Sequence, residues 1–174
     1  MTYYSYKEKQ YIKDLGIKVL VLSSAIVTFL LVAGLMYKDY EAGKDLTEYW
    51  LSLGIIAVVE IGVYLLIFKM GMNLEGGSEG IRFSYPPFLI KPKEISWSMI
   101  ETWQIRQIKP FKEFGGWGYK FSFKGKKTGL VLKEGDGIEI LLKSGKTWVI
   151  TINNAEMLRS LLRKHIPEKE VKSE

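Results

Sequence analysis

Two long apolar stretches near the N-terminus limit the possible folds of this chain more than any other feature. The first runs from Val19 to Tyr37 without a charge, and the second runs from Tyr49 to Phe68 with Glu60 as its one charge. A helix rises about 1.5 Å per residue, so either stretch matches a hydrocarbon core about 30 Å thick. Neither has the polar stripe that a surface helix of a soluble protein needs. The pattern predicts two transmembrane helices, 19–37 and 49–68, joined by an extracytoplasmic loop, 38–48.

A cleaved signal peptide is the alternative interpretation of the first stretch. The apolar region of such a peptide has about 7–15 residues and follows a short basic start. Here eighteen residues precede a longer apolar run. A retained membrane helix is therefore favoured.

The lysines beside the two stretches predict their orientation. Segment 1–18 contains four lysines, whereas loop 38–48 contains two and is acidic overall. Because cytoplasmic flanks carry the excess of Lys and Arg, we expect both termini in the cytoplasm. Segment 1–18 is interpreted as a short cytoplasmic lead-in whose tyrosines lie along the inner surface: Tyr3, Tyr4, Tyr6 and Tyr11.

From Asn73 onward apolar and polar residues alternate, which is typical of strands with one buried face. The expected core-facing residues include Tyr119, Phe121 and Phe123, with lysines on the opposite face. Turn residues separate the strands at Gly76-Gly77-Ser78, Glu134–Gly137 and Ser144-Gly145, and we expect the last two to close hairpins. About seven successive antiparallel strands favour a sandwich or a barrel.

One amphipathic helix is expected to end the fold. Asn153 is the predicted N-cap, Glu156 is placed as in a capping box, and Pro167 stops the helix. The prediction is therefore a transmembrane hairpin followed by a mainly-β (α+β) domain, 73–166, in which the helix caps the strands, and a polar tail, 167–174. About seven strands followed by one helix is the outline of a pleckstrin-homology-like (PH-like) domain.

The stretch from Phe114 to Leu162 resembles small bacterial membrane proteins that have two transmembrane helices and a C-terminal PH-like domain. The likeness is carried by Gly115-Gly116-Trp117-Gly118 before a strand, by GIEILLKSGK (137–146), and by the hydrophobic strand that leads into the capped helix. With the upstream residues it covers roughly Gly80 to Ile166. The resemblance implies a PH-like fold and a bacterial inner (plasma) membrane location, and it implies no activity.

A basic stretch and its tryptophan form the candidate binding surface. The stretch comprises Lys109, Lys112, Lys120, Lys124, Lys126, Lys127 and Trp117. A lysine beside an anionic leaflet gains about 1 kcal/mol, so these residues are expected to bind the membrane surface or a protein partner. An ordinary solvated face is the alternative. Nucleic acid is not expected, because a membrane tether holds the domain at the bilayer.

Glu60 is the candidate intramembrane polar site. A carboxylate at that depth costs roughly 2.5–3.5 kcal/mol, so we expect Glu60 at a helix interface, where Ser23, Ser24 and Thr28 supply hydrogen bonds or a second copy of the chain packs.

Composition limits the chemistry. The chain has no cysteine and one histidine, His165, which excludes thiol catalysis and cysteine-ligated metal sites. No catalytic constellation is visible, and we expect no cofactor. The resulting hypothesis is a membrane-anchored, non-catalytic binding module at the cytoplasmic face, and the alternative is a small oligomeric channel or transporter accessory subunit that uses Glu60.

Overall fold

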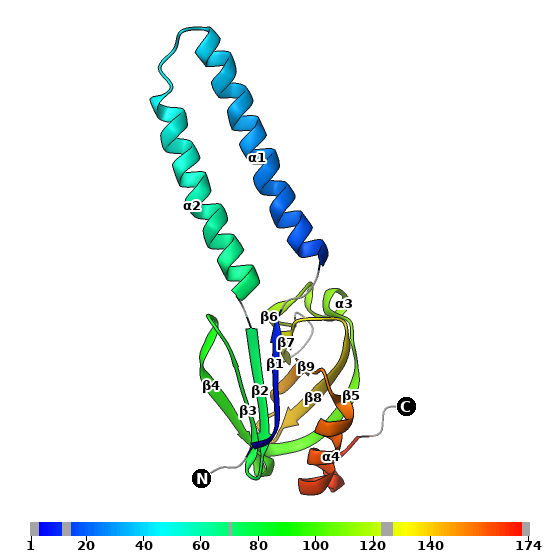
Figure 1. Cartoon of the computed structure of the whole chain (residues 1–174). Coiled ribbons are helices and arrows are strands. Elements are labelled where there is room, and N and C mark those ends of the chain that lie inside the picture. The colour runs from blue at the N-terminus through cyan, green and yellow to red at the C-terminus, as the bar shows by residue number, and fades with distance from the viewer. Residues whose placement is uncertain (1–3, 12–14, 70, 123–126, 172–174) are drawn as a thin grey trace. The chain divides into compact units, whose positions relative to one another are not determined.

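A computed structural model describes residues 4–11, 15–69, 71–122 and 127–171. The chain divides into two compact units (Figure 1). One is helical and comprises Lys13–Lys69, and the other is a β unit made of Met1–Ile12 together with Met70–Glu174.

The helical unit contains the two predicted helices. α1 spans Leu15–Glu41 and α2 spans Thr47–Lys69, and they run antiparallel (Figure 1). Both are long and apolar enough to cross a membrane. Among the helical residues whose side chains are described, Val21 alone is buried. Because so much apolar area would be unfavourable in water, these helices require an apolar environment.

The turn between the helices is organised by acidic side chains. Asp39 accepts hydrogen bonds from the Tyr49 hydroxyl at 2.7 Å and from the Lys44 ammonium at 2.9 Å. Asp45 accepts the Thr47 backbone N–H at 3.0 Å, which satisfies a free donor at the start of α2. Both helices extend beyond their predicted bounds, so this turn is shorter than the predicted loop 38–48.

The β unit contains nine described strands in two sheets, two more than the approximate number predicted. The first sheet has the order β1-β2-β3-β4 and the second has the order β5-β8-β9-β7-β6. The first comprises β1 (Tyr4–Tyr11), β2 (Gly71–Gly77), β3 (Gly80–Tyr85) and β4 (Leu89–Ser96). The second comprises β5 (Ile100–Ile108), β6 (Gly118–Phe121), β7 (Lys127–Val131), β8 (Gly135–Leu142) and β9 (Thr147–Thr151). Neighbours are antiparallel except β7 and β9, which are parallel.

Two of the three predicted turns are confirmed. Gly76-Gly77-Ser78 leads from β2 to its partner β3, and Ser144-Gly145 closes the β8–β9 hairpin, where Gly145 has φ +77°. The predicted hairpin at Glu134–Gly137 is wrong, because β9 lies between β7 and β8. Adjacent strands in the sequence are therefore separated in the sheet at this point.

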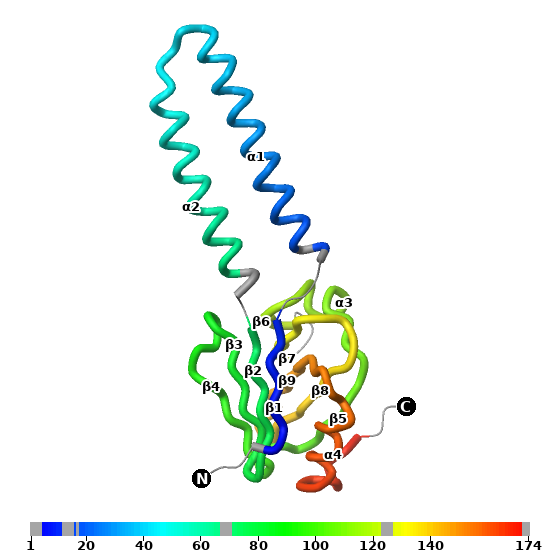
Figure 2. The backbone as a smooth tube through the Cα atoms, viewed as in Figure 1, coloured from blue at the N-terminus to red at the C-terminus, as the bar shows by residue number. Residues whose placement is uncertain are grey.

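The N-terminal segment is a strand of the β unit and not the expected membrane-surface lead-in. β1 pairs antiparallel with β2 along nearly its whole length, as the neighbouring strands in Figure 2 show. Tyr6 is 2% exposed and Gln10 is 4% exposed, so one face of β1 packs into the domain. The helical unit is consequently an insertion between two neighbouring strands.

The core lies between the two sheets and is closed at one end by α4 (Ala155–His165). The rings of Phe83 in β3 and Trp148 in β9 meet at 4.9 Å. Leu161 of α4 packs against Gly76, where a Cβ atom would lie 2.5 Å from the leucine side chain. The N-cap of α4 is Asn154, which accepts the Met157 N–H at 3.0 Å, and not the predicted Asn153.

Two short elements complete the β unit. α3 (Pro110–Phe114) covers the outer face of the second sheet, where Phe114 packs with Ile108, Val131 and Val149. After α4, the 3-10 turn Pro167–Lys169 returns the chain to β5, and the Val171 N–H donates to the Trp103 carbonyl at 2.9 Å. The predicted polar tail is thus packed on the domain as far as Val171. The 3-10 turn Trp97–Met99 links β4 to β5.

Candidate functional site

The predicted basic stretch is distributed over several elements. Lys109 precedes α3, Lys112 lies within it, Lys120 lies in β6 and Lys127 begins β7. Lys124 and Lys126 lie outside the described residues. The structure thus places three of the described lysines on three separate elements and Lys109 directly before one of them.

Lys127 belongs to an ionic network on the outer face of the second sheet. Its ammonium lies 2.6 Å from Glu139 Oε1, and the other oxygen of Glu139 pairs with Arg106. Arg106 also binds Glu113 of α3 at 2.6 Å. Burial by itself raises the pKa of the Glu139 carboxyl, but hydrogen bonds from Lys127 and Arg106 outweigh it and lower that pKa below its usual value. The network fastens α3 to the sheet, so the Lys127 ammonium has a structural role.

Trp117 lies in a loop that only glycines accommodate easily. Gly115, Gly116 and Gly118 have φ values of +71°, +139° and +105°, as the Gly-Gly-Trp-Gly motif predicts. The half-buried Trp117 ring meets Phe111 edge-on at 4.3 Å, and Phe111 is 61% exposed. The indole is therefore supported by a second aromatic ring that faces solvent.

One end of the β unit, here called the junction end, is where Tyr11 of β1 pairs with Gly71 of β2. The β3–β4 turn also lies at this end. β3 runs antiparallel to β2, and Ser84, near the end of β3, is paired with Asn73, near the start of β2. That turn carries Phe88, which is 60% exposed. Figure 1 shows α3 and the start of β6 at the same end and α4 at the opposite one.

A cleft opens between edge strand β4 of the first sheet and strands β6, β7 and β9 of the second. Its volume is about 360 Å³, and we call it the aromatic–lysine cleft. It is lined by Leu89, Lys93, Tyr119, Phe121, Lys127, Thr128, Lys146 and Trp148. Trp148, 5% exposed, is its most buried lining side chain, and the Lys93 ammonium lies 4.9 Å from the centre of the indole. The Tyr119 and Phe121 rings meet edge-on at 5.2 Å.

This cleft corrects the predicted placement of the β6 aromatics. Phe121 is 64% exposed and Tyr119 is half-buried, so neither lies in the core as expected, and Phe123 lies outside the described residues. The physical reason is the position of β6 at a sheet edge, opposite a β4 strand whose middle residues are exposed. Alternation along one strand shows two unlike faces, but it does not show whether another sheet covers the apolar one.

Sequence reasoning missed the two lysines of the cleft. Lys93 lies in the Lys-Pro-Lys run of β4, and Lys146 follows the Ser144-Gly145 turn. They are distant in sequence, and only the approach of β4 to the second sheet brings them to one cleft. The available signal for Lys93 was the Lys-Pro-Lys run, which is typical of an exposed edge strand.

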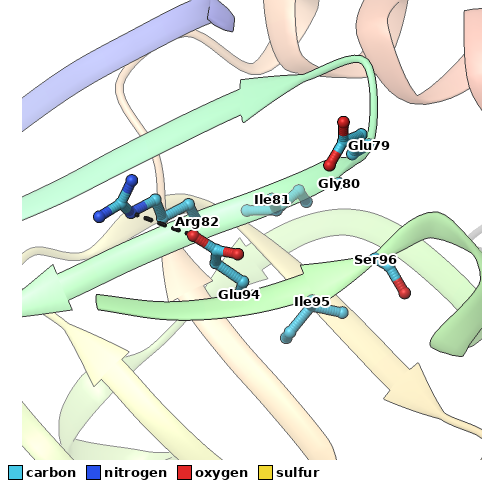
Figure 3. A pocket seen from close by; sticks show the side chains of 7 residues that line it. All are labelled: Glu79, Gly80, Ile81, Arg82, Glu94, Ile95 and Ser96. Atoms are coloured by element: carbon cyan, nitrogen blue, oxygen red, sulfur yellow. Dashed lines mark ion pairs between the residues drawn. The ribbon is translucent and has the colours of Figure 1, made fainter. Parts of the chain in front are cut away.

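A second hollow lies along the β3–β4 ladder and is shown in Figure 3. Its charged side chains include Arg82 and Glu94, which form an ion pair at 3.5 Å. Ile81 and Ile95 are buried, and Gly80 lies against the backbone, where a Cβ atom would approach the Ile95 carbonyl oxygen to 2.2 Å. Glu79 also lines the hollow, so its charged side chains are one guanidinium, which is paired with Glu94, and a second carboxylate.

Glu60 lines a groove of about 570 Å³ between α1 and α2, which also contains Lys18. The expected hydrogen bonds from the α1 hydroxyls to Glu60 are not formed. Ser23, Ser24 and Thr28 instead donate to backbone carbonyls of their own helix at 2.8–2.9 Å. The ionisable side chains that line the groove are those of Glu60, Lys18 and Tyr64.

The single histidine has a packing role. His165 stacks on Trp97 with a centroid distance of 5.4 Å and an interplanar angle of 11°. Over the described ranges, no three His, Cys, Asp or Glu side chains group in a way that could hold a metal ion. The ionic network around Arg106 joins α3 to the second sheet and so has a structural role.

Comparison with known proteins leaves the geometry as the basis for a functional proposal. No protein-family model, curated protein or solved structure matches this chain.

Proposed function

We propose that this chain is a membrane-anchored, non-catalytic binding module that presents a PH-like domain at the cytoplasmic face of a bacterial inner membrane. The observation that carries the proposal is the pairing of Tyr11 with Gly71. The chain leaves the β unit and re-enters it at two directly opposite residues. A hairpin of two spanning helices returns to the side from which it started, so this connection keeps the entire β unit on one side.

The exposed apolar helices support the membrane anchor. Most of their large apolar side chains are more than one-third exposed, and the β unit has its own separate core. The cytoplasmic side is supported by the greater number of lysines in segment 1–18 than in loop 38–48.

The junction end supports a contact with the inner leaflet. It carries Trp117 and exposed Phe88 and Phe111, with Lys109 and Lys112 at α3. Aromatic rings favour the headgroup region, and each lysine near an anionic leaflet contributes about 1 kcal/mol. Lipid is thus the first proposed partner, and a protein bound by the same surface is the second.

The architecture of two sheets with a C-terminal helix across one end of the core supports the PH-like assignment. Two features distinguish it from the simple outline of about seven antiparallel strands. They are the nine described strands and the parallel β7–β9 pair.

Cysteine labelling tests the topology, because the chain has no native cysteine. Ala42→Cys places a thiol in the turn between the helices, and Lys143→Cys places one in the exposed β8–β9 turn. In intact spheroplasts we expect a membrane-impermeant maleimide to label the first variant and to reach the second only after lysis. The reverse pattern, or protein in the soluble fraction without detergent, would refute the proposal.

The groove that contains Glu60 and Lys18 favours a second candidate function, a small oligomeric channel or transporter accessory subunit. A second copy of the chain that packs through α1 and α2 would enclose the groove. On this proposal Glu60→Gln changes proton or ion flux in vesicles. A change in oligomer stability alone would assign Glu60 to the helix interface.

A further inference from the structure

We propose that the aromatic–lysine cleft binds a phosphate monoester that carries an apolar group. This inference deepens the proposed function, because it names the ligand class of the binding module, and it rests on that function only for the source of the ligand. The source is either a soluble phosphate ester or the headgroup of an anionic lipid.

The cleft is a defined site because it is built from strands of both sheets. Leu89 and Lys93 come from β4, Tyr119 and Phe121 from β6, and Trp148 from β9. Trp148 is held by the Phe83 ring across the core, so its indole is a fixed part of the lining. A volume of about 360 Å³ is at the lower end of the range of roughly 300–1,000 Å³ for small-molecule sites.

The charge of the cleft selects an anion. The Lys93 ammonium is held over the Trp148 indole, an arrangement that cation–π attraction stabilises. Lys146 adds a second ammonium from the β8–β9 turn. Neither forms an ion pair within the described part of the chain, in contrast to Lys127, whose ammonium is bound to Glu139. Two lysines act as point charges, which match a phosphate dianion better than a single carboxylate.

The β6 aromatics select the other part of the ligand. Phe121 is 64% exposed although it belongs to a strand, and its ring meets Tyr119 edge-on. Exposed aromatic area beside two cations fits a ligand with an apolar group next to its anionic group. An apolar group gains burial there, and a flat one such as phenyl also gains ring contact.

An added peptide strand is a poor fit to the same cleft. Pro92 lies in the middle of β4 between Lys91 and Lys93, and proline has no backbone N–H to donate to a new neighbour. Proline and lysine on an edge strand oppose strand addition. A small anion does not need the β4 backbone.

Calorimetric titration of the full chain in neutral phosphatidylcholine nanodiscs tests the proposal with phenyl phosphate as the probe. We expect saturable binding at least ten-fold tighter than that of inorganic phosphate or phenol alone. Lys93→Gln and Lys146→Gln should each weaken it at least five-fold. Phe121→Ala should weaken phenyl phosphate without affecting inorganic phosphate. The matched control is Lys164→Gln, which removes an exposed lysine from α4 and should leave binding unchanged.

Competition identifies the source of the ligand. If a lipid headgroup is the natural ligand, phosphatidic acid added to the nanodiscs should displace phenyl phosphate from the wild-type chain. If the natural ligand is soluble, phenyl phosphate should stay bound. Either result supports binding in the cleft. No phenyl phosphate binding, or equal weakening by Lys93→Gln and Lys164→Gln in variants with unchanged melting temperatures, would overturn it. The cysteine-labelling pattern is independent of this cleft, so failure here and failure of the membrane anchor are distinguishable.

Discussion

Replacing Tyr6 by alanine tests whether the N-terminal segment belongs to the β unit. Tyr6 is 2% exposed, and its hydroxyl donates to Glu8 Oε2 at 2.6 Å. The same carboxylate oxygen accepts the Asn153 N–H at 2.9 Å, which connects β1 to the start of α4. Removing a buried aromatic side chain costs about 3–5 kcal/mol. For a domain of this size about 4 °C is lost per kcal/mol, so we expect a fall of roughly 12–20 °C in melting temperature.

The measurement is thermal unfolding of the full chain in detergent, followed by near-ultraviolet circular dichroism, which reports the packing of the β unit. Tyr11→Ala is the matched control, because it removes the same side chain from the same strand at a position that is 41% exposed. We expect the control to cost less than about 1 kcal/mol. Equal and small effects of the two substitutions would refute the packing of β1 and return the segment to a separate lead-in.

Three further predictions concern folding. A fragment of residues 71–174 should fail to fold, because β2 loses its neighbour and the buried Tyr6 and Gln10 are absent; dispersed amide NMR signals from this fragment would contradict the expectation. The pKa of Glu139 is lower in the folded state than its usual value of 4.5, so its carboxylate stabilises the fold above that pH and the contribution is lost as the pH falls through the folded-state pKa. Melts at several pH values should therefore show an acid-dependent loss of stability that is smaller in Glu139→Gln, and identical pH profiles would argue against the ionic network. Asn154→Ala should destabilise the domain by about 1 kcal/mol through loss of the helix cap, whereas Asn153→Ala should cost less; chemical denaturation distinguishes them, and the opposite order would restore the cap predicted from the sequence.

The candidate site shows why one-dimensional patterns were insufficient. The basic stretch was visible in the sequence, but its neighbours in space were not. Lys127 is bound by Glu139, twelve positions away on β8, while Lys93 and Lys146 line one cleft although they are fifty-three positions apart. A charge count along the chain cannot distinguish a lysine that is neutralised by a partner from one that is available to a ligand.

The order of the strands was hidden for a related reason. Glu134–Gly137 has the composition of a hairpin turn, yet β9 enters between β7 and β8 and pairs parallel with β7. Turn chemistry shows that the chain changes direction. It does not show which strand supplies the next ladder, because that depends on which buried faces fit together.

The amino-acid sequence alone determined the two long apolar helices, several strand positions and the C-terminal helix, because each depends on hydrophobic periodicity and local turn residues within one segment. The tertiary structure alone decided that Tyr4–Tyr11 completes the first sheet and that β6 presents its aromatic rings to solvent. Both depend on contacts between segments far apart in the chain. Fifty-nine residues, 12–70, separate Tyr11 of β1 from its partner Gly71 in β2. The local propensity of neither segment indicates that the two strands pair across this distance.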